Sequence, residues 1–324
     1  MSNRILLTFD VEDFINVGSL TALRSILELL EKYGLRGVFF ITGHMAEKLA
    51  LLPEITRSLG THEIGFHSSS HSVHPTIFEY CDVERYEDAY CASLQRETSH
   101  IDPLSGDTEG DGGILELRKL FPNKNIEAYR APGYCCPPPN LDAMVTLGIK
   151  FDFSSNFSRI PALYKEITFY PCPLFLDCEK ALLSDEANLV SWLIFLRSIF
   201  MQGVTVLNFH PDRFVNINSW DCIYHKGNPK KLEGVETRKT QQTHNMLGRM
   251  DQLLKAMNYL EKVKIVRTSP DLVVPRATLS VANIDIEKAV DSLTYWPRLF
   301  FGYNPKYTYS QLVEFFQLNW EAGT

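Results

Sequence analysis

Short apolar runs alternate with amphipathic segments along most of this chain. Residues 5–9 form the first such run, which is typical of a strand buried on both faces. Between the runs, apolar residues recur at the three-four spacing of helices, and Gly34 closes the first helical segment. The expected strands are 5–9, 37–42, 63–66, 126–130, 149–153, 203–209 and 264–266, and the expected helices are 19–32, 45–51, 82–100, 140–147, 189–201 and 246–262. This alternation predicts right-handed crossovers and a mostly parallel α/β sheet.

The last fifty residues break the alternation. Aromatic residues are frequent between Tyr295 and Tyr309, and helical patterns cover 286–293 and 310–320. We therefore expect one barrel domain over residues 1–270 and a helical appendage over 271–324. The appendage would pack on the barrel or form an oligomer face, which leaves a homo-oligomer open.

Composition and charge argue against a nucleic-acid partner, a membrane span and a disulfide framework. The net charge is −7 over 324 residues, and no stripe of Lys and Arg with interleaved aromatic residues occurs, which argues against a nucleic-acid partner. No apolar run is long enough to span a bilayer, and Met1 to Arg4 lead straight into the first strand without a signal peptide. We expect a cytoplasmic protein with no integral membrane segment. Seven cysteines, an odd number, favour reduced thiols over a disulfide framework.

Titratable residues recur where the expected strands end. They are Asp10, Glu12 and Asp13 after the first strand, His67 and His71 after the third, and Arg130, Asp152 and His210 after later ones. In a parallel barrel the carboxyl ends of all strands meet at one rim, so these groups would share one mouth.

The acids after the first strand and the two histidines together predict a metal site. Three neighbouring carboxylates repel one another unless a cation lies among them. His67 and His71 have the spacing at which one helical turn can offer both imidazoles to a single ion, and a carboxylate from the first strand would complete the set.

Five sequence motifs extend this interpretation. They are TFDVED at 8–13, HEIGFHSSSH at 62–71, RAPGY at 130–134, LGIKFDFSS at 147–155 and LNFH at 207–210. In this order they resemble the five motifs of the polysaccharide deacetylase family, also called NodB-homology or carbohydrate esterase family four. The resemblance covers about residues 5–266 and leaves the carboxyl-terminal tail uncovered.

The resemblance implies a distorted (β/α) barrel with one divalent metal ion. Asp10 would be the general base, and His67 and His71 would be metal ligands. Many family members carry a second aspartate directly after the base, where this chain has Val11. Residues i and i+2 of a strand share a face, so we expect Glu12 as the third ligand, with Asp13 as the alternative if the chain has already turned. Zinc is the expected metal, and cobalt, nickel and iron are alternatives.

The same resemblance suggests roles for four further residues. Arg130 would keep Asp10 ionised, and a backbone N–H in the Gly133–Tyr134 turn would stabilise an oxyanion. His210 would protonate the leaving amine while Asp152 orients its ring.

The implied activity is hydrolysis of the N-acetyl group of an acetamido sugar or glycan. Surface polysaccharide or lipopolysaccharide biosynthesis is the expected setting. Two alternatives stay open at this point: a metal-dependent amidase acting on a cyclic or small N-acyl substrate, and a catalytically degenerate member that binds sugar.

Overall fold

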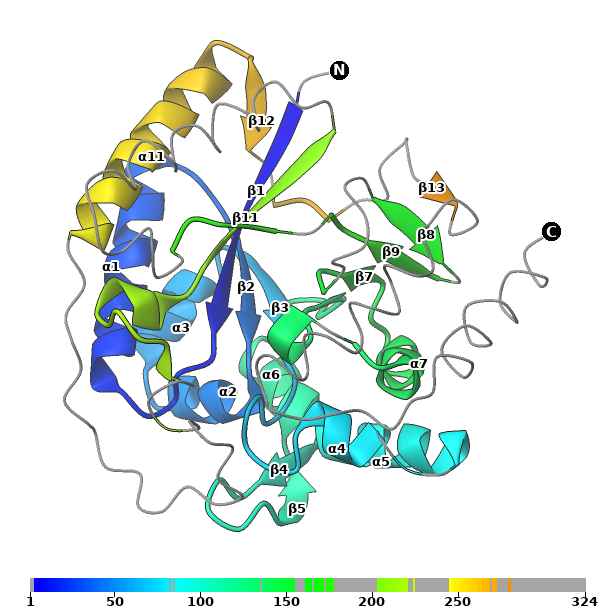
Figure 1. Ribbon diagram of the computed structural model, residues 1–324. Helices are drawn as coiled ribbons and strands as arrows, with labels where there is room; N and C mark the ends of the chain where they lie inside the picture. Colours follow the sequence, from blue (N-terminus) through cyan, green and yellow to red (C-terminus); the bar gives the residue numbers. More distant parts are fainter. Residues whose placement is uncertain are drawn as a thin grey trace.

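The computed structural model describes most of the first 270 residues and little of the chain after them. The described residues are 3–81, 83, 85–134, 136–154, 161–164, 166–171, 173–177, 203–220, 224, 245–268, 270–272 and 279–280. Most of their strands form one large curved sheet with helices around it (Figure 1).

Strand β1 (Asn3–Val11) is an interior strand of this sheet, third in its order. It pairs in parallel with β2 (Val38–Ile41) on one edge and with β11 (Val204–Phe209) on the other, and its first residues also pair with β12 (Val266–Thr268). The expected buried strand at 5–9 is therefore confirmed. The sheet order is β10-β11-β1-β2-β3-β6-β7-β9-β8-β13.

The sheet is parallel except between β8 and β9, which pair antiparallel. This architecture confirms the predicted α/β fold, a distorted (β/α) barrel with mostly parallel strands. Strands β4 and β5 form a separate antiparallel pair outside it. The remaining strands are β3 (Glu63–Phe66), β4 (Ser99–Ile101), β5 (Thr108–Asp111), β6 (Ala128–Tyr129), β7 (Phe151–Asp152), β8 (Ala162–Tyr164), β9 (Ile167–Phe169), β10 (Leu174–Phe175) and β13 (Leu279–Ser280).

Alternation along β1 assigns its side chains to two cores. Ile5, Leu7 and Phe9 belong to the large cluster between the sheet and the helices. Leu6 belongs to the second cluster with Phe40 from β2. Because successive side chains point to opposite faces of a strand, Thr8 and Asp10 follow Leu6 onto the side of that second cluster. The strand thereby directs a polar face away from the helices, where the candidate site lies.

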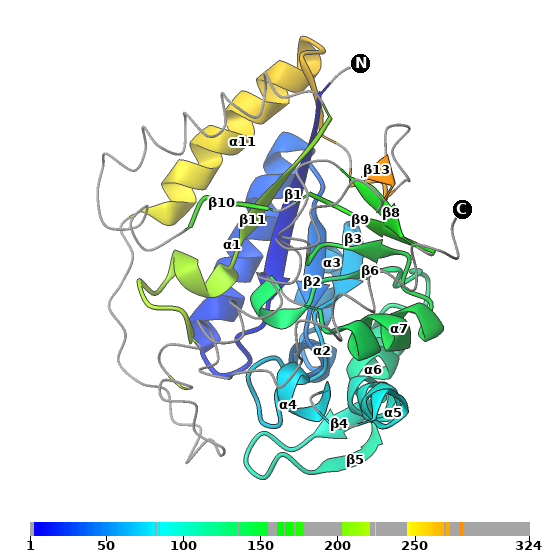
Figure 2. The same ribbon diagram turned by 45° about the vertical axis from the view of Figure 1, so that its right-hand side comes forward.

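Helices connect most of the parallel strands. They are α1 (Val17–Tyr33), α2 (Gly43–Ala50), α3 (Pro53–Leu59), α4 (Ile77–Cys81), α5 (Tyr86–Thr98), α6 (Gly113–Leu120), α7 (Pro138–Thr146) and α11 (Met246–Lys262), with 3-10 turns η1 (Pro132–Tyr134) and η2 (Pro211–Phe214). Helix α11 lies along α1 and β12 (Figure 2), and Asp251 of α11 accepts hydrogen bonds from Lys32 and Tyr33 at the end of α1. Helix α1 ends at Gly34, whose φ of 65° is the left-handed conformation that glycine adopts readily.

One expectation is wrong, and two others fall on residues that the structure does not describe. The single helix expected over 82–100 is wrong in extent, because α5 ends at Thr98 and the next residues pair with β5. The appendage expected over 271–324 lies outside the described residues, apart from 271–272 and β13. The helix expected over 189–201 also lies outside them. Within the described part of the chain, no helix combines the length and the apolar character needed to cross a membrane.

Candidate active site

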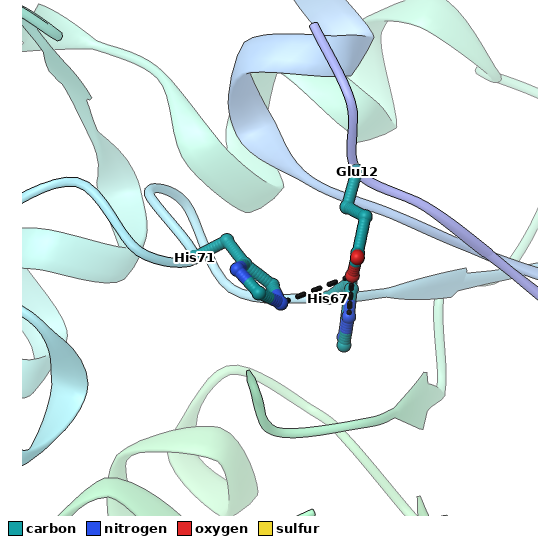
Figure 3. A group of neighbouring side chains, drawn as sticks. All are labelled: Glu12, His67 and His71. Atoms are coloured by element: carbon teal, nitrogen blue, oxygen red, sulfur yellow. Dashed lines mark hydrogen bonds and ion pairs between the residues drawn. The ribbon is translucent and has the colours of Figure 1, made fainter. Parts of the chain in front are cut away.

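Three side chains from two strand ends converge on one point at the carboxyl-terminal rim. Glu12 follows β1 directly, His67 follows β3, and His71 comes four residues later. Oε2 of Glu12 lies 3.0 Å from Nε2 of His67 and 3.0 Å from Nε2 of His71 (Figure 3). All three residues are buried, and their ligand atoms lie within 4.8 Å of one another. The structure thus brings together the three residues predicted as ligands.

The chemistry of these atoms fits a divalent metal. Nδ1 of His67 lies 2.7 Å from the backbone oxygen of Arg130. A carbonyl oxygen only accepts, so this nitrogen carries the proton, and Nε2 is the ring nitrogen left to hold a metal ion. Two imidazole nitrogens and one carboxylate oxygen form a donor set suited to zinc and related metals.

Glu12 has the ionisation state that a ligand needs. Burial by itself would raise the pKa of its carboxyl group, but His71 and His67 act in the opposite direction and outweigh burial. The pKa of Glu12 therefore lies well below its ordinary value.

A buried carboxylate shapes the loop between the two histidines. The segment is a loop with positive φ at Ser68 (66°) and His71 (47°), so the two imidazoles meet without the helical turn that their spacing suggested. Glu97 of α5 accepts hydrogen bonds from the Ser68 hydroxyl and the Ser69 backbone N–H, both at 2.8 Å. These bonds hold the loop in a conformation that costs non-glycine residues energy.

Asp13, the alternative third ligand, faces away from the histidines. Its Oδ1 accepts from the backbone N–H groups of Ile15 (3.1 Å) and Asn16 (3.0 Å), and its Oδ2 accepts from the side chains of Asn16 and Ser19. Asp13 therefore organises the turn into α1, and the acid that meets the two imidazoles is Glu12.

Asp10 lies beside this cluster and accepts hydrogen bonds on both oxygens. Oδ1 accepts from Nη1 of Arg130 at 2.5 Å. Oδ2 accepts from the Tyr134 hydroxyl and from Nδ2 of Asn208, both at 2.8 Å, and lies 3.4 Å from Nε2 of His210. Burial by itself raises the pKa of Asp10, but the charge of Arg130 and the neighbouring imidazoles hold it far below its ordinary value. The carboxylate is ionised and fixed in orientation.

Arg130 is itself held on several sides. Its Nη1 also donates to Oδ1 of Asn208 at 2.6 Å, and its Nη2 donates to the Thr8 hydroxyl at 3.1 Å. The guanidinium lies 4.2 Å from the centre of the Phe40 ring. The expected contact between Arg130 and Asp10 is present, within a network that includes Asn208. This asparagine belongs to the LNFH motif but was not predicted as a site residue.

The carboxylate that orients His210 is Asp177, and the predicted pairing with Asp152 is wrong. Oδ2 of Asp177 lies 3.0 Å from Nδ1 of His210 and accepts its backbone N–H at 2.6 Å. Burial by itself would lower the pKa of His210, but Asp177 and Asp10 raise it by more than burial lowers it. The pKa of His210 therefore lies well above its ordinary value. The imidazole is therefore protonated near neutral pH.

Asp152 instead stabilises the neighbouring loop. It accepts from the Ser154 backbone N–H (2.9 Å) and hydroxyl (2.8 Å), and Ser154 accepts from the backbone N–H of Ala131 at 2.7 Å. Burial raises the pKa of Asp152 to about 7. The reason for the error is topological. Strand β10 pairs in parallel with β11, so the residues that follow these two strands, Asp177 and His210, become neighbours.

Tyr134 reaches the site through its side chain. Its backbone N–H, in the turn expected to stabilise an oxyanion, donates to the oxygen of Ala131 at 3.1 Å. Its hydroxyl donates to Asp10 and also bonds Asn208. Trp220, far along the chain and likewise not predicted, donates its indole N–H to Oε1 of Glu12 at 2.8 Å. No pattern near Trp220 in the sequence signals this contact.

Comparison with known proteins identifies a family that part of this chain is similar to. Residues 2–103 match the family model described as polysaccharide deacetylase. Over this amino-terminal segment, roughly a third of the chain, the sequence is similar to the polysaccharide deacetylase family. The segment contains Asp10, Glu12, His67 and His71, so the resemblance noted from the motifs is confirmed where the candidate ligands lie. None of the curated proteins matches this chain by sequence.

The solved structures that are similar to this chain are distant from it in sequence. A CE4 esterase from Streptococcus mutans has 15% identity and a TM-score of 0.43, covering 86% of this chain and 85% of its own. The catalytic domain of a peptidoglycan N-acetylglucosamine deacetylase from Eubacterium rectale has 12% identity and a TM-score of 0.44, covering 86% and 93%. A CE4 family pseudoenzyme from Bacillus anthracis has 14% identity and a TM-score of 0.38, covering 65% and 55%.

Proposed function

We propose that this protein is a metal-dependent hydrolase that removes the N-acetyl group from an acetamido sugar of a surface polysaccharide or its precursor. The observation that carries the proposal is that Asp10 and His210 lie together, 3.4 Å apart, at the rim where Glu12, His67 and His71 converge. An ionised carboxylate and a protonated imidazole are the two groups that amide hydrolysis needs. The family match supports an acetylated glycan as the substrate class.

Glu12, His67 and His71 would hold the ion, for which we propose zinc. A divalent ion in such a site lowers the pKa of a water molecule towards about 7 and polarises a carbonyl oxygen. The residues around it do the rest of the chemistry.

Asp10 would accept the proton of the attacking water. Arg130 and Asn208 fix both of its oxygens, so the base is oriented before the substrate arrives. The water oxygen adds to the acetyl carbonyl carbon. His210 then donates its proton to the sugar nitrogen as the C–N bond breaks, and acetate and the free amine leave. Asp177 would hold the His210 ring in the orientation and charge state for this transfer.

Acetate release tests the proposal directly. Zinc-loaded protein should release acetate from N-acetylated glycan oligomers, and chelation should abolish the release. Asp10→Asn should lower the rate about 10²- to 10⁴-fold while zinc stays bound, because the amide cannot accept a proton and Glu12, His67 and His71 are unchanged. Asp111→Asn, which changes an exposed carboxylate on β5, is the matched control and should keep full activity.

Two results of the acetate assay would count against the proposal. Zinc-loaded protein that releases no acetate from any acetylated glycan would contradict the proposal. Turnover of small N-acyl or cyclic amides with no turnover of glycans would replace the substrate class while keeping the site.

A further inference from the structure

We propose that Trp220 is a positioning residue for the metal ligand Glu12, and that it restricts this carboxylate to one coordinating oxygen. The inference rests on the proposed metal site. Nε1 of Trp220 lies 2.8 Å from Oε1 of Glu12, whereas Oε2 is the oxygen that faces both imidazoles. The two oxygens of Glu12 therefore have different partners, and the indole determines which one faces the site.

The indole is held firmly enough to impose this choice. Trp220 is fully buried, and its ring packs against those of Phe14 and His71, with ring centres 5.7 and 5.4 Å away. Its backbone N–H donates to Oδ2 of Asp212 at 2.9 Å. One aromatic side chain thus contacts two of the three candidate ligands, His71 through its ring and Glu12 through its N–H.

The chemistry of an indole suits this task. Its N–H can donate but cannot accept, and it does not titrate, so it can bond a carboxylate at any working pH without competing for the ion. With Oε1 engaged, Glu12 would offer Oε2 alone, and the protein would supply three donor atoms to the ion. The remaining coordination positions would be left for water and substrate. A carboxylate that bound through both oxygens would occupy one of them.

Metal affinity tests the role without any substrate. Replacing Trp220 by 3-benzothienyl-L-alanine keeps the bicyclic shape and puts sulfur in place of the N–H. Zinc affinity, measured by competition with a chromophoric chelator, should fall about 10- to 100-fold, the effect typical of removing a partner that orients a ligand. Trp220→Phe should show at least the same loss.

Tyr224→Phe is the matched control. Tyr224 belongs to the same buried cluster as Trp220, and its hydroxyl donates to Oδ1 of Asn16 at 2.9 Å, away from Glu12. Its loss should leave zinc affinity within about threefold of the wild type, because the hydroxyl that it removes bonds Asn16 rather than Glu12. Thermal unfolding of the metal-free proteins verifies that each variant is folded.

Each outcome separates the inference from the site it rests on. Wild-type protein that binds no zinc would overturn the metal site and the inference with it. A benzothienyl variant that binds zinc as tightly as the wild type would overturn the inference and leave the metal site standing.

A measurement on the unaltered side chain covers the case in which the variants fail to fold. The chain has four tryptophans, so ¹⁵N-indole labelling gives four N–H signals, and Trp192→Phe, Trp296→Phe and Trp320→Phe assign the remaining one to Trp220. That signal should shift on addition of zinc and be protected from exchange. A Trp220 signal that neither shifts nor is protected would overturn the inference.

Discussion

Nη1 of Arg130 lies 2.5 Å from Oδ1 of Asp10, and both side chains are buried. The two residues come from different strand ends, β6 and β1, with two strands between them in the sheet. This ion pair therefore links two strands that are not neighbours in the sheet. Its members also share Asn208, which accepts from Arg130 and donates to Asp10.

Removing the arginine should destabilise the fold. Arg130→Met takes away the cation that bonds Oδ1 of the buried Asp10 carboxylate, and breaking a buried pair in this way costs about 3–5 kcal/mol. Urea denaturation measures the loss. The double variant Arg130→Met/Asp10→Asn should be more stable than the single variant, because no charge is then left unpaired. A single variant within 1 kcal/mol of the wild type would contradict the assigned pairing.

The partner of His210 can be identified from the pH profile. A general acid must be protonated, so activity is lost as pH rises through its pKa. Asp177 raises the pKa of His210, against burial, which lowers it. In Asp177→Asn the alkaline limb of kcat/KM should therefore move to lower pH, with a fall in rate of about 10²-fold or more.

Asp152→Asn serves as the comparison for that experiment. Asp152 bonds Ser154 rather than His210, so the alkaline limb should stay in place. A profile that shifts in Asp152→Asn and not in Asp177→Asn would restore the pairing first expected from the sequence.

Substitutions at Glu12 and Asp13 should have different effects, the first on metal binding and the second on stability. Glu12→Gln removes an anionic ligand, and the purified protein should retain less than about a tenth of the zinc bound by the wild type. Asp13→Ala should keep its zinc but lose about 1–2 kcal/mol of stability, because the turn into α1 loses its hydrogen-bond acceptor. Elemental analysis and thermal unfolding measure the two effects. Zinc loss in Asp13→Ala from a folded protein would show that the ligand assignment is wrong.

His62 should make stability depend on pH. Burial holds the pKa of His62 at about 4, below its ordinary value of 6.5, and its Nδ1 accepts the backbone N–H of Gly37 at 3.2 Å. The unfolded state therefore binds a proton first, so stability is complete above pH 6.5 and falls as pH drops towards 4. At about 1.4 kcal/mol per pKa unit the loss approaches about 3 kcal/mol.

His62→Asn isolates this contribution. Its Oδ1 can still accept from Gly37, but the side chain does not titrate. The difference in unfolding free energy between wild type and variant should change by about 3 kcal/mol between pH 7 and pH 4, whereas other groups affect both proteins alike. A constant difference would contradict the prediction.

Local pattern was sufficient for the strands and for the ligands that follow them directly. A strand buried on both faces requires consecutive apolar side chains, so β1 was visible as residues 5–9, and alternation of side chains set Glu12 on the same face as Asp10. The first helix was also predicted closely, at 19–32 against the observed Val17–Tyr33, because Gly34 gives a local stop signal. Parallel strands share one rim, which is why Asp10, His67 and His210 could be grouped before any coordinates.

The sequence by itself thus determined the fold class, the acidic strand end and the two imidazoles. Only the tertiary structure decided the contacts made across the rim: Asp177 on His210, Asn208 on Asp10 and Trp220 on Glu12. It also decided that Asp13 turns away from the histidines and that Asp152 does not reach His210. Periodicity reports which face of its own strand a residue occupies. Which side chains meet across the rim depends on the order of strands in the sheet and on the paths of the loops, and no local pattern encodes either.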